Sequence, residues 1–502
     1  MPTDCLPDNP NIEQLKANAK TLRDLVRANF AEPIALVREH HPRFANLQGG
    51  TAEATAFKLS DAQLTLARHY GSASWPRLRQ HVELVNQLTR SPHTQPVGGE
   101  PDDDQGRADE LLRLACLNYG ADSPQRWHDA ARLLHEHPGL AGASIHTAAA
   151  VGDLAFASRI LAADPAAANR QGGPFRWEPL LYLTYSRLET DGQDPLAVAR
   201  LLLDHGADPN AGYLWDGLPS PFTALTGVFG RGEQGAPPHR DELVLARMLL
   251  DAGAEANDSQ TIYNRGAGDI ARDDTEFLAL LLDFGLGRGD GGPWRRRLVD
   301  HHQAPAEIVA EALQHAAETG LTSRVEVLLG RGADPDAPGT HPLYLRRRPY
   351  EGAILHGNLH VAELLAAAGA DTTRTDPLTR FIGTCMAGDR GAVAQATAEA
   401  PQLLERALAE HGDLVARAAE LGRPTAIHQL VELGFDVNAR HRTTALHEAA
   451  LRGNLPILKV LLDLGADPTI VDESYNSTPT GWAEHNGHSH IVAFLNHTGT
   501  AI

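Results

Sequence analysis

Residues 443–469 read T-T-A-L-H-E-A-A-L-R-G-N-L-P-I-L-K-V-L-L-D-L-G-A-D-P-T and predict two short helices joined by a tight turn. The first helix, over 444–451, begins with a hydroxyl side chain that can cap free backbone N–H groups, and Gly453-Asn454 ends it. The second helix carries isoleucine, valine and leucine at helical spacing and stops at Gly465, which can adopt the left-handed backbone conformation. Neither helix can bury its apolar stripe alone, so the unit needs a neighbour on each side.

The same terminating glycine recurs along the chain. It stands at Gly206, Gly253, Gly285, Gly332, Gly369, Gly434 and Gly465. Successive members are 47, 32, 47, 37, 65 and 31 residues apart, against about 33 for a common repeat of two helices. The gap of 65 is close to two periods and contains a degraded unit around 392–404, whereas the gaps of 47 require insertions. The sequence therefore predicts an all-α solenoid of about ten helix-loop-helix units.

This pattern resembles the ankyrin repeat. Residues 444–467 match T-x-L-H-x-A-A-x-x-G-x-x-x-(I/V)-x-x-x-L-L-x-x-G-A-D nearly position for position. The resemblance implies an array over 108–502, a structural role for His447 in hydrogen bonds to neighbouring reversing loops, and protein binding as the usual role. Two departures weaken single units: Ala445 replaces the usual proline, and Gly481 replaces the histidine in the last unit.

The first 90 residues do not repeat and predict a small helical bundle. Apolar side chains at helical spacing indicate helices over 11–29 and 34–40, and Ser60 and Ser74-Trp75-Pro76 start two more. The stretch 59–78 resembles a helical segment that precedes the array in many bacterial ankyrin-repeat proteins. Trp75 is expected to be the buried anchor of the bundle.

Residues 91–107 lack an apolar period and contain many helix breakers and acidic residues. We expect them to form a flexible acidic linker between the bundle of residues 1–90 and the array.

The overall charge disfavours two classes of partner. The chain has 44 Lys and Arg against 64 Asp and Glu, a formal net charge of -20, which repels nucleic acids and anionic membrane surfaces. Cys5, Cys116 and Cys385 form no C-x-x-C pair, so neither a disulfide framework nor a thiolate metal site is expected. No stretch resembles a signal peptide or a membrane span, and a cytoplasmic location is the default expectation.

The sequence contains no recognisable catalytic signature. It lacks G-x-S-x-G, a Walker-type loop, a dinucleotide fingerprint and H-E-x-x-H. The cluster His485, His488 and His490 could ligate a metal, but Gly487 interrupts the helix and no cysteine or paired carboxylate completes a ligand set. We therefore predict no catalytic residue, no metal and no cofactor.

Three enlarged loops, 210–241, 285–305 and 336–351, stand out because they combine aromatic residues with arginine. In an ankyrin stack the loops after the second helices project toward one edge, so such insertions could form a composite surface. The candidate binding residues are Tyr213, Trp215, Phe222, Trp294, Arg295, Arg296, Arg297, Tyr344, Arg346, Arg347, Arg348 and Tyr350. Trp, Tyr and Arg dominate binding hot spots, and two arginine triplets suit an acidic or phosphorylated protein partner. The alternative is that these loops fold back, their aromatic rings fill the stack, and their arginines pair with surplus acids.

The favoured hypothesis is a non-enzymatic, cytoplasmic, bacterial scaffold that binds a protein partner. The alternative is an enzyme or small-molecule binder in which the inserted loops close over a pocket and His, Asp and Arg side chains act as acids and bases. A deep cavity holding a histidine beside a carboxylate would favour the enzyme, and an open surface with exposed aromatic and arginine side chains would favour the scaffold.

Overall fold

The computed structural model describes most of the chain and divides it into two compact units. The described residues are Leu6 and 10–99, 101–232, 235–266, 272–298, 302–341, 344–440 and 442–498, so Cys5 lies outside them. Unit 1 comprises 1–231, 236–265 and 283–305, and unit 2 comprises 232–235, 266–282 and 306–502.

The N-terminal bundle of unit 1 has four longer helices and one short one. They are α1 (Ile12–Arg27), α2 (Ala31–His40), α3 (Ala52–Thr55), α4 (Leu59–His69) and α5 (Trp75–Leu88). Asn11 caps α1, because its side chain accepts hydrogen bonds from the backbone N–H groups of Glu13 and Gln14. The partly buried Trp75 packs against two apolar clusters, one around Phe57 and one around Leu78, and so connects them as an anchor.

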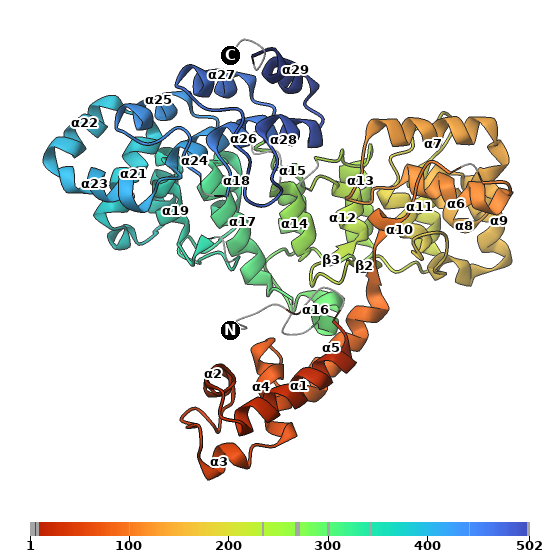
Figure 1. The fold of residues 1–502 in the computed structure, drawn as a ribbon. Helices are drawn as coiled ribbons and strands as arrows, with labels where there is room; N and C mark the ends of the chain where they lie inside the picture. The colour runs from red at the N-terminus through yellow and green to blue at the C-terminus, as the bar shows by residue number, and fades with distance from the viewer. Residues whose placement is uncertain are drawn as a thin grey trace. The chain divides into compact units, whose positions relative to one another are not determined.

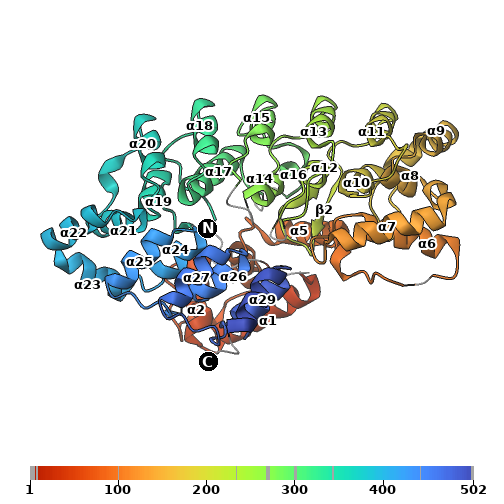
Figure 2. The ribbon, with the colours of Figure 1, turned by 90° about the horizontal axis from the view of Figure 1, so that it is seen from above.

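Consecutive helical pairs follow the bundle in unit 1. They are α6 (Asp104–Ala115) and α7 (Pro124–Glu136), α8 (Ile145–Val151) and α9 (Leu154–Ala163), α10 (Pro179–Tyr185) and α11 (Pro195–Asp204), and α12 (Ala224–Phe229) and α13 (Glu242–Asp251), with α14 (Ser259–Gly266) and α16 (Gly292–Leu298) after them. Short 3-10 helices η2 (Pro138–Gly142) and η3 (Pro165–Asn169) follow α7 and α9. The second helices α9, α11 and α13 stand in one row, with the first helices α8, α10 and α12 in another (Figure 2).

A small sheet interrupts this helical pattern. Strands β2 (Gly212–Trp215) and β3 (Pro221–Thr223) form an antiparallel hairpin, and β1 (Thr89–Arg90), directly after α5, pairs with β2 in parallel. Figure 1 shows α5 leading from the bundle to this hairpin and to α16. The region 210–241 therefore contains a hairpin and the first helix of a repeat, and its remaining insertion, 230–241, lies between α12 and α13.

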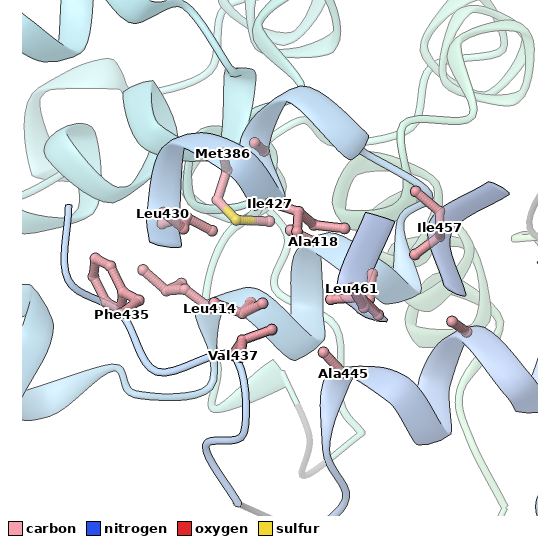
Figure 3. Packing of buried hydrophobic residues seen from close by; sticks show 14 of the residues in the cluster. Met386, Leu414, Ala418, Ile427, Leu430, Phe435, Val437, Ala445, Ile457 and Leu461 are labelled. Atoms are coloured by element: carbon pink, nitrogen blue, oxygen red, sulfur yellow. The ribbon is translucent and has the colours of Figure 1, made fainter. Parts of the chain in front are cut away.

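Unit 2 continues the helical array. Its elements are α15 (Glu276–Asp283), α17 (Pro305–Thr319), α18 (Thr322–Gly330), α19 (Pro349–Leu355), α20 (Leu359–Ala367), η6 (Thr372–Arg374), α21 (Pro377–Ala387), α22 (Arg390–Glu399), α23 (Pro401–Glu410), α24 (Leu414–Glu420), α25 (Pro424–Glu432), α26 (Ala445–Leu451), α27 (Leu455–Asp463), α28 (Pro479–His485) and α29 (Ser489–Thr498). Helices α22 and α23 form the degraded unit predicted around 392–404. A continuous apolar core runs through α21–α29, where Leu430, Leu461 and their neighbours interdigitate (Figure 3).

Repeated polar contacts hold successive repeats in register. The seven terminating glycines all have positive φ, from +80° at Gly206 to +102° at Gly285, which confirms the predicted left-handed helix ends. His447 Nε2 donates to the Ser477 carbonyl oxygen at 3.0 Å, and His146 Nε2 donates to the Arg170 carbonyl oxygen at 2.7 Å. The predicted structural role of His447 is therefore confirmed.

In several reversing loops, an asparagine side chain hydrogen-bonds to the backbone of the Gly-Ala-Asp or Gly-Ala-Glu turn in the next repeat. Asn438 Nδ2 donates to the Gly465 carbonyl oxygen at 3.1 Å, and its Oδ1 accepts from the Asp467 N–H at 2.8 Å. Asn169 makes the same two bonds to Gly206 and Asp208, and Asn210 makes them to Gly253 and Glu255, in each case in the turn of the following repeat. These bonds satisfy backbone groups that the helix end leaves without partners.

The segment predicted as a flexible linker contains regular structure. Residues Pro92–Thr94 form a 3-10 helix, and α6 begins at Asp104, where the Asp103 side chain caps it. Between them, the Gly98 N–H donates to Glu110 Oε1 at 2.6 Å. Local capping and contacts with the first repeat thus shape much of 91–107, although its composition lacks an apolar period.

Candidate interaction surfaces

The aromatic residues of the first insertion pack inward. Tyr213 and Phe222 are buried, with ring centroids 5.6 Å apart, and Tyr213 stacks on Trp177 at 5.0 Å. Trp215 is half-buried, and its Nε1 donates to the Asn118 carbonyl oxygen at 3.1 Å. Tyr213 and Trp215 are two residues apart on β2 and therefore share a face of the strand, where both rings lie near Phe222. Most of this aromatic set therefore fills the stack.

The second insertion adds a helix that supports the N-terminal bundle. Trp294 is 4% exposed and lies in a cluster with Leu214, Leu298 and Val85 of α5. Its Nε1 donates to the Asn210 carbonyl oxygen at 3.0 Å. The two insertions together thus build a platform on which the end of α5 docks, and the bundle and first repeats form one compact unit.

The first arginine triplet lies on α16 and does not form a single patch. Consecutive helical residues point about 100° apart, so Arg295, Arg296 and Arg297 face different directions. Arg295 donates to the His302 carbonyl oxygen at 2.8 Å, and the exposed Arg296 pairs with Asp290 at 2.7 Å. Arg297 is also exposed and lies over the Trp294 ring.

The second arginine triplet lies in an irregular loop with an unusual tip. Leu345 and Arg346 have φ values of +49° and +61°, a left-handed conformation that is unfavourable for both residue types. Leu345 is 76% exposed and Arg346 is exposed as well. Arg347 binds Glu318 through two 3.2 Å contacts, and Arg348 pairs with Asp336 at 3.1 Å. Two ion pairs therefore brace the base of a projecting apolar and cationic tip.

Tyr344 and Tyr350 flank this tip and are both partly exposed. The Tyr344 ring makes an edge contact with His341, with centroids 6.0 Å apart. Tyr350 lies in the first turn of α19. The structure thus places five of the predicted candidates around one loop of unit 2, whereas the candidates of unit 1 surround the hairpin and α16.

Three arginine side chains lie near His356, at the C-terminal end of α19. Burial, followed by the charges of Arg417, Arg347 and Arg423, lowers the pKa of His356 to about 3. Arg423 donates to the His356 and Met386 carbonyl oxygens, which satisfies its guanidinium without a carboxylate partner in those bonds. Arg347 pairs with Glu318 and Arg417 with Asp413, so two of these three guanidinium groups have carboxylate partners.

A second projecting tip was missed by the sequence reasoning. Tyr475 is 77% exposed, and its ring contacts the edge of Trp482 with centroids 6.1 Å apart. Asp472 holds this loop by accepting hydrogen bonds from the backbone N–H groups of Ser474, Tyr475 and Ser477 and from Trp482 Nε1. Burial opposes ionisation of Asp472, but these bonds outweigh it and lower its pKa to about 2. An aspartate followed by turn-forming residues was the available signal.

The histidine cluster of the last unit has a structural role. His488 Nε2 donates to the Leu451 carbonyl oxygen at 2.9 Å, and His490 Nε2 donates to the Gly453 carbonyl oxygen at 3.2 Å. Both bonds satisfy the end of the preceding first helix. Among the described residues, no group of three or more His, Cys, Asp or Glu side chains is placed to hold a metal ion.

One cavity places a histidine beside a carboxylate. Asp258 and His302 line an enclosed space of about 10 Å³, which has room for a single water molecule. Burial raises the pKa of Asp258, which accepts bonds from Thr223 Oγ1 and the Thr261 N–H, and burial lowers the pKa of His302. A histidine beside a carboxylate with shifted pKa values is what an enzyme site would show, but this cavity is too small for a substrate.

A larger, open hollow of about 350 Å³ lies at the helix turns of unit 2. Its lining is Gly320, Thr322, Gly357, Asn358, Leu359, His360, Val361 and Ala387. Its one imidazole, His360, lies 3.6 Å from the Glu363 carboxylate, but both side chains are exposed and solvent screens the pair.

Comparisons with known proteins agree with this architecture. Residues 415–502 match the family model for ankyrin repeats in three copies. The palmitoyltransferase Hip14 of Drosophila melanogaster is 34% identical over 83 residues, which cover 16% of this chain and 13% of that protein. The putative ankyrin repeat protein FPV219 of Fowlpox virus (strain NVSL) is 29% identical over 144 residues, or 26% of this chain and 31% of its own length.

The E3 ubiquitin-protein ligase Ufd4 of Drosophila melanogaster is 36% identical over 85 residues, which cover 16% of this chain and 3% of that protein. The chain spans less than a third of each of these three relatives. Residues 415–502 therefore form ankyrin repeats, and the predicted all-α solenoid is confirmed. Among the described residues, no helix is both long and apolar enough to cross a membrane.

Proposed function

We propose that this protein is a non-enzymatic scaffold that binds a protein partner through the loop tips of its repeats. The observation that carries the proposal is the tip at Leu345 and Arg346. An exposed leucine and an exposed arginine stand there in a left-handed conformation while two ion pairs brace the loop beneath them. Backbone strain of this kind persists only where the surrounding structure holds it, and it gathers at binding sites.

The partner that fits this tip is an acidic or phosphorylated protein segment. Guanidinium groups bind carboxylates and phosphates through paired, charge-assisted hydrogen bonds, and Leu345 adds an apolar contact. Tyr344, Arg347, Arg348 and Tyr350 contribute to this binding loop, and Trp215 and Arg295–Arg297 to a second surface in unit 1. Tyr213, Phe222 and Trp294 support that surface from below.

We further propose a cytoplasmic location in a bacterium, which the resemblance of the N-terminal bundle suggests. Cys116 and Cys385 are free, and burial raises the pKa of each to about 12, so neither is poised for disulfide exchange.

The experiment is affinity capture from native cytosol with tagged full-length protein, comparing wild type with Arg346→Glu. The matched control is Arg390→Glu, which reverses the charge of an exposed arginine on α22. We expect Arg346→Glu to lose a stoichiometric protein that wild type and Arg390→Glu both retain. Equal capture by all three proteins, with each correctly folded, contradicts the proposed site.

A variant that lacks the three arginine charges of α16 then tests the second surface. Replacing Arg295–Arg297 by alanine should weaken capture less than Arg346→Glu does, because these side chains face different directions. A co-purifying metabolite without a stoichiometric protein would instead favour the small-molecule alternative.

A further inference from the structure

The segment that joins the bundle to the array, residues 89–98 (the connecting segment), lies along one edge of the hairpin. Thr89 pairs with Leu214 and Arg90 with Trp215 in the parallel ladder between β1 and β2. The Asp216 N–H donates to the Arg90 carbonyl oxygen at 3.1 Å. Because β3 occupies the opposite edge of β2, the connecting segment completes a sheet of order β1-β2-β3.

Side chains of the connecting segment occupy formed contacts on the repeats. The Ser91 hydroxyl hydrogen-bonds Asp216, and His93 Nε2 lies 3.2 Å from the other Asp216 carboxylate oxygen. The His93 ring stacks on Trp215, with centroids 4.4 Å apart. Gly120 provides the space, since a Cβ atom there would lie 2.4 Å from the Cβ of His93.

These contacts are separate from those that dock the bundle. Helix α5 is held by Val85, which packs with Leu214, Trp294 and Leu298. The ladder of the connecting segment, by contrast, is two residues long. Arg90 and Pro92 of the connecting segment are also buried, and the Gly98 N–H donates to Glu110 Oε1, so a peptide that displaces the segment has to replace these contacts as well.

We propose that the edge of β2, with Trp215 and Asp216, is a binding groove for a peptide that adds two residues as a strand and then turns, and that the connecting segment occupies it in cis. In the connecting segment the strand covers Thr89 and Arg90, and Ser91 and His93 lie at the 3-10 turn that follows. Main-chain hydrogen bonds of the strand supply affinity, and the side chains of the turn supply specificity. The partner is a protein segment with Ser or Thr followed two positions later by His, like Ser91 and His93. It displaces the connecting segment, so the groove is autoinhibited. This proposal does not depend on the basic loops of the proposed function.

Tethering sets the size of the effect to be measured. A segment joined by a short chain has an effective concentration of about 1 mM. For a peptide that binds the empty groove with a Kd of about 10 µM, cis occupancy weakens the apparent affinity about 100-fold.

The test uses full-length protein and a labelled synthetic peptide with the sequence of residues 88–98, followed by fluorescence anisotropy. In one variant, ten Gly and Ser residues replace residues 89–98. We expect this variant to bind the peptide about 100-fold more tightly than wild type does. The same variant with Trp215→Ala and Asp216→Ala should lose binding, and a peptide with alanine at the positions of Ser91 and His93 should bind neither protein. Equal affinity of wild type and the replacement variant overturns the proposal.

A milder variant keeps the proposal testable if the replacement unfolds unit 1. Ser91→Ala with His93→Ala preserves the backbone and removes the two side-chain contacts. We expect this double variant to bind the unaltered peptide at least about 10-fold more tightly than wild type. Binding that is unchanged, or that persists after Trp215→Ala, shows that the segment is only a structural connection.

Discussion

The hairpin region of unit 1 and the regular repeats at the end of unit 2 solve the same packing problem with different residues. In α24–α29 the core consists of small and branched aliphatic side chains such as Ala418, Ala449 and Leu461. Around α10–α13 it adds aromatic rings to the aliphatic side chains, including the fully buried Trp177 and Tyr185. Small residues let helices stack at a regular spacing, whereas large rings need added chain to enclose them.

This difference changes what the surface offers. The insertions of unit 1 turn their large side chains toward the stack and hold α5. In unit 2, Leu345 and Tyr475 project outward from loops, with 76% and 77% of their surface exposed. Long aromatic loops therefore serve internal docking in unit 1, whereas the tips of unit 2 leave large side chains exposed, as the proposed function requires.

Removing the docking tryptophan should produce the largest effect. Trp294→Ala leaves a cavity beneath α5 and removes the bond to the Asn210 carbonyl oxygen, at a cost of about 3–5 kcal/mol in the stability of unit 1. Hydrogen exchange followed by mass spectrometry should show faster exchange in α5 and β2. The comparison variant is Trp482→Ala in the regular repeats, where the ring is half-buried and the loss should be less than half as large. Unchanged protection of α5 would refute the docking role of α16.

The insertion of unit 1 should also be sensitive to acid. Burial, followed by the charges of Arg187 and Arg240, lowers the pKa of His239 to about 3. The unfolded side chain binds a proton below about pH 6.5 and the native one does not until about pH 3, so the free energy of unfolding falls as the pH falls below 6.5. The expected loss from this residue is about 2 kcal/mol at pH 5.

The matched variant is His239→Asn, whose Oδ1 can replace Nδ1 as the acceptor of the Asp241 N–H. Denaturant unfolding from pH 7 to pH 5 should show a shallower decline in the variant than in wild type. Parallel declines in the two proteins would mean that His239 titrates normally in the folded state.

The regular repeats were predictable because their signals are local. Thr444, His447 and Gly465 lie within one unit, and each acts on backbone groups a few residues away or one repeat along. The docking of Val85 on Trp294 joins residues more than two hundred positions apart, and apolar character alone does not select that partner. Similarly, the sequence of Arg295–Arg297 suggests one basic patch, but on α16 the three side chains point in different directions around the helix.

The exposed tips were predictable only in part. The arginines of 346–348 were visible as residue types, but the left-handed conformation that projects Leu345 depends on the ion pairs beneath it. Tyr475 owes its exposure to Asp472, which gathers three backbone N–H groups and Trp482 Nε1. A turn of this kind can be predicted from the sequence, but the direction in which the loop projects from the stack is set by tertiary packing.

Removing the asparagine side chains that bind the next turn should lower stability by a similar amount in both regions, and by less than Trp294→Ala does. Asn438→Ala and Asn210→Ala each remove two hydrogen bonds to the next turn, and each should lower stability by about 1–2 kcal/mol. Asn438→Asp keeps the acceptor for the Asp467 N–H but loses the donor, so its loss should be about half as large. A much larger loss at Asn210 than at Asn438 would mean that the Asn210 side chain also supports the aromatic core.

The smallest expected change in stability is at Tyr475, and it separates packing from recognition most directly. Because the ring is 77% exposed, Tyr475→Ala should change the free energy of unfolding by less than about 0.5 kcal/mol. Asp472 and Trp482 hold the loop without the Tyr475 side chain, so its backbone should keep its conformation. If the tip recognises the partner, capture should still fall by about 10-fold or more, as expected for an aromatic hot spot. A loss of capture with unchanged unfolding assigns Tyr475 to recognition, whereas unchanged capture restricts the partner surface to the loop around Arg346.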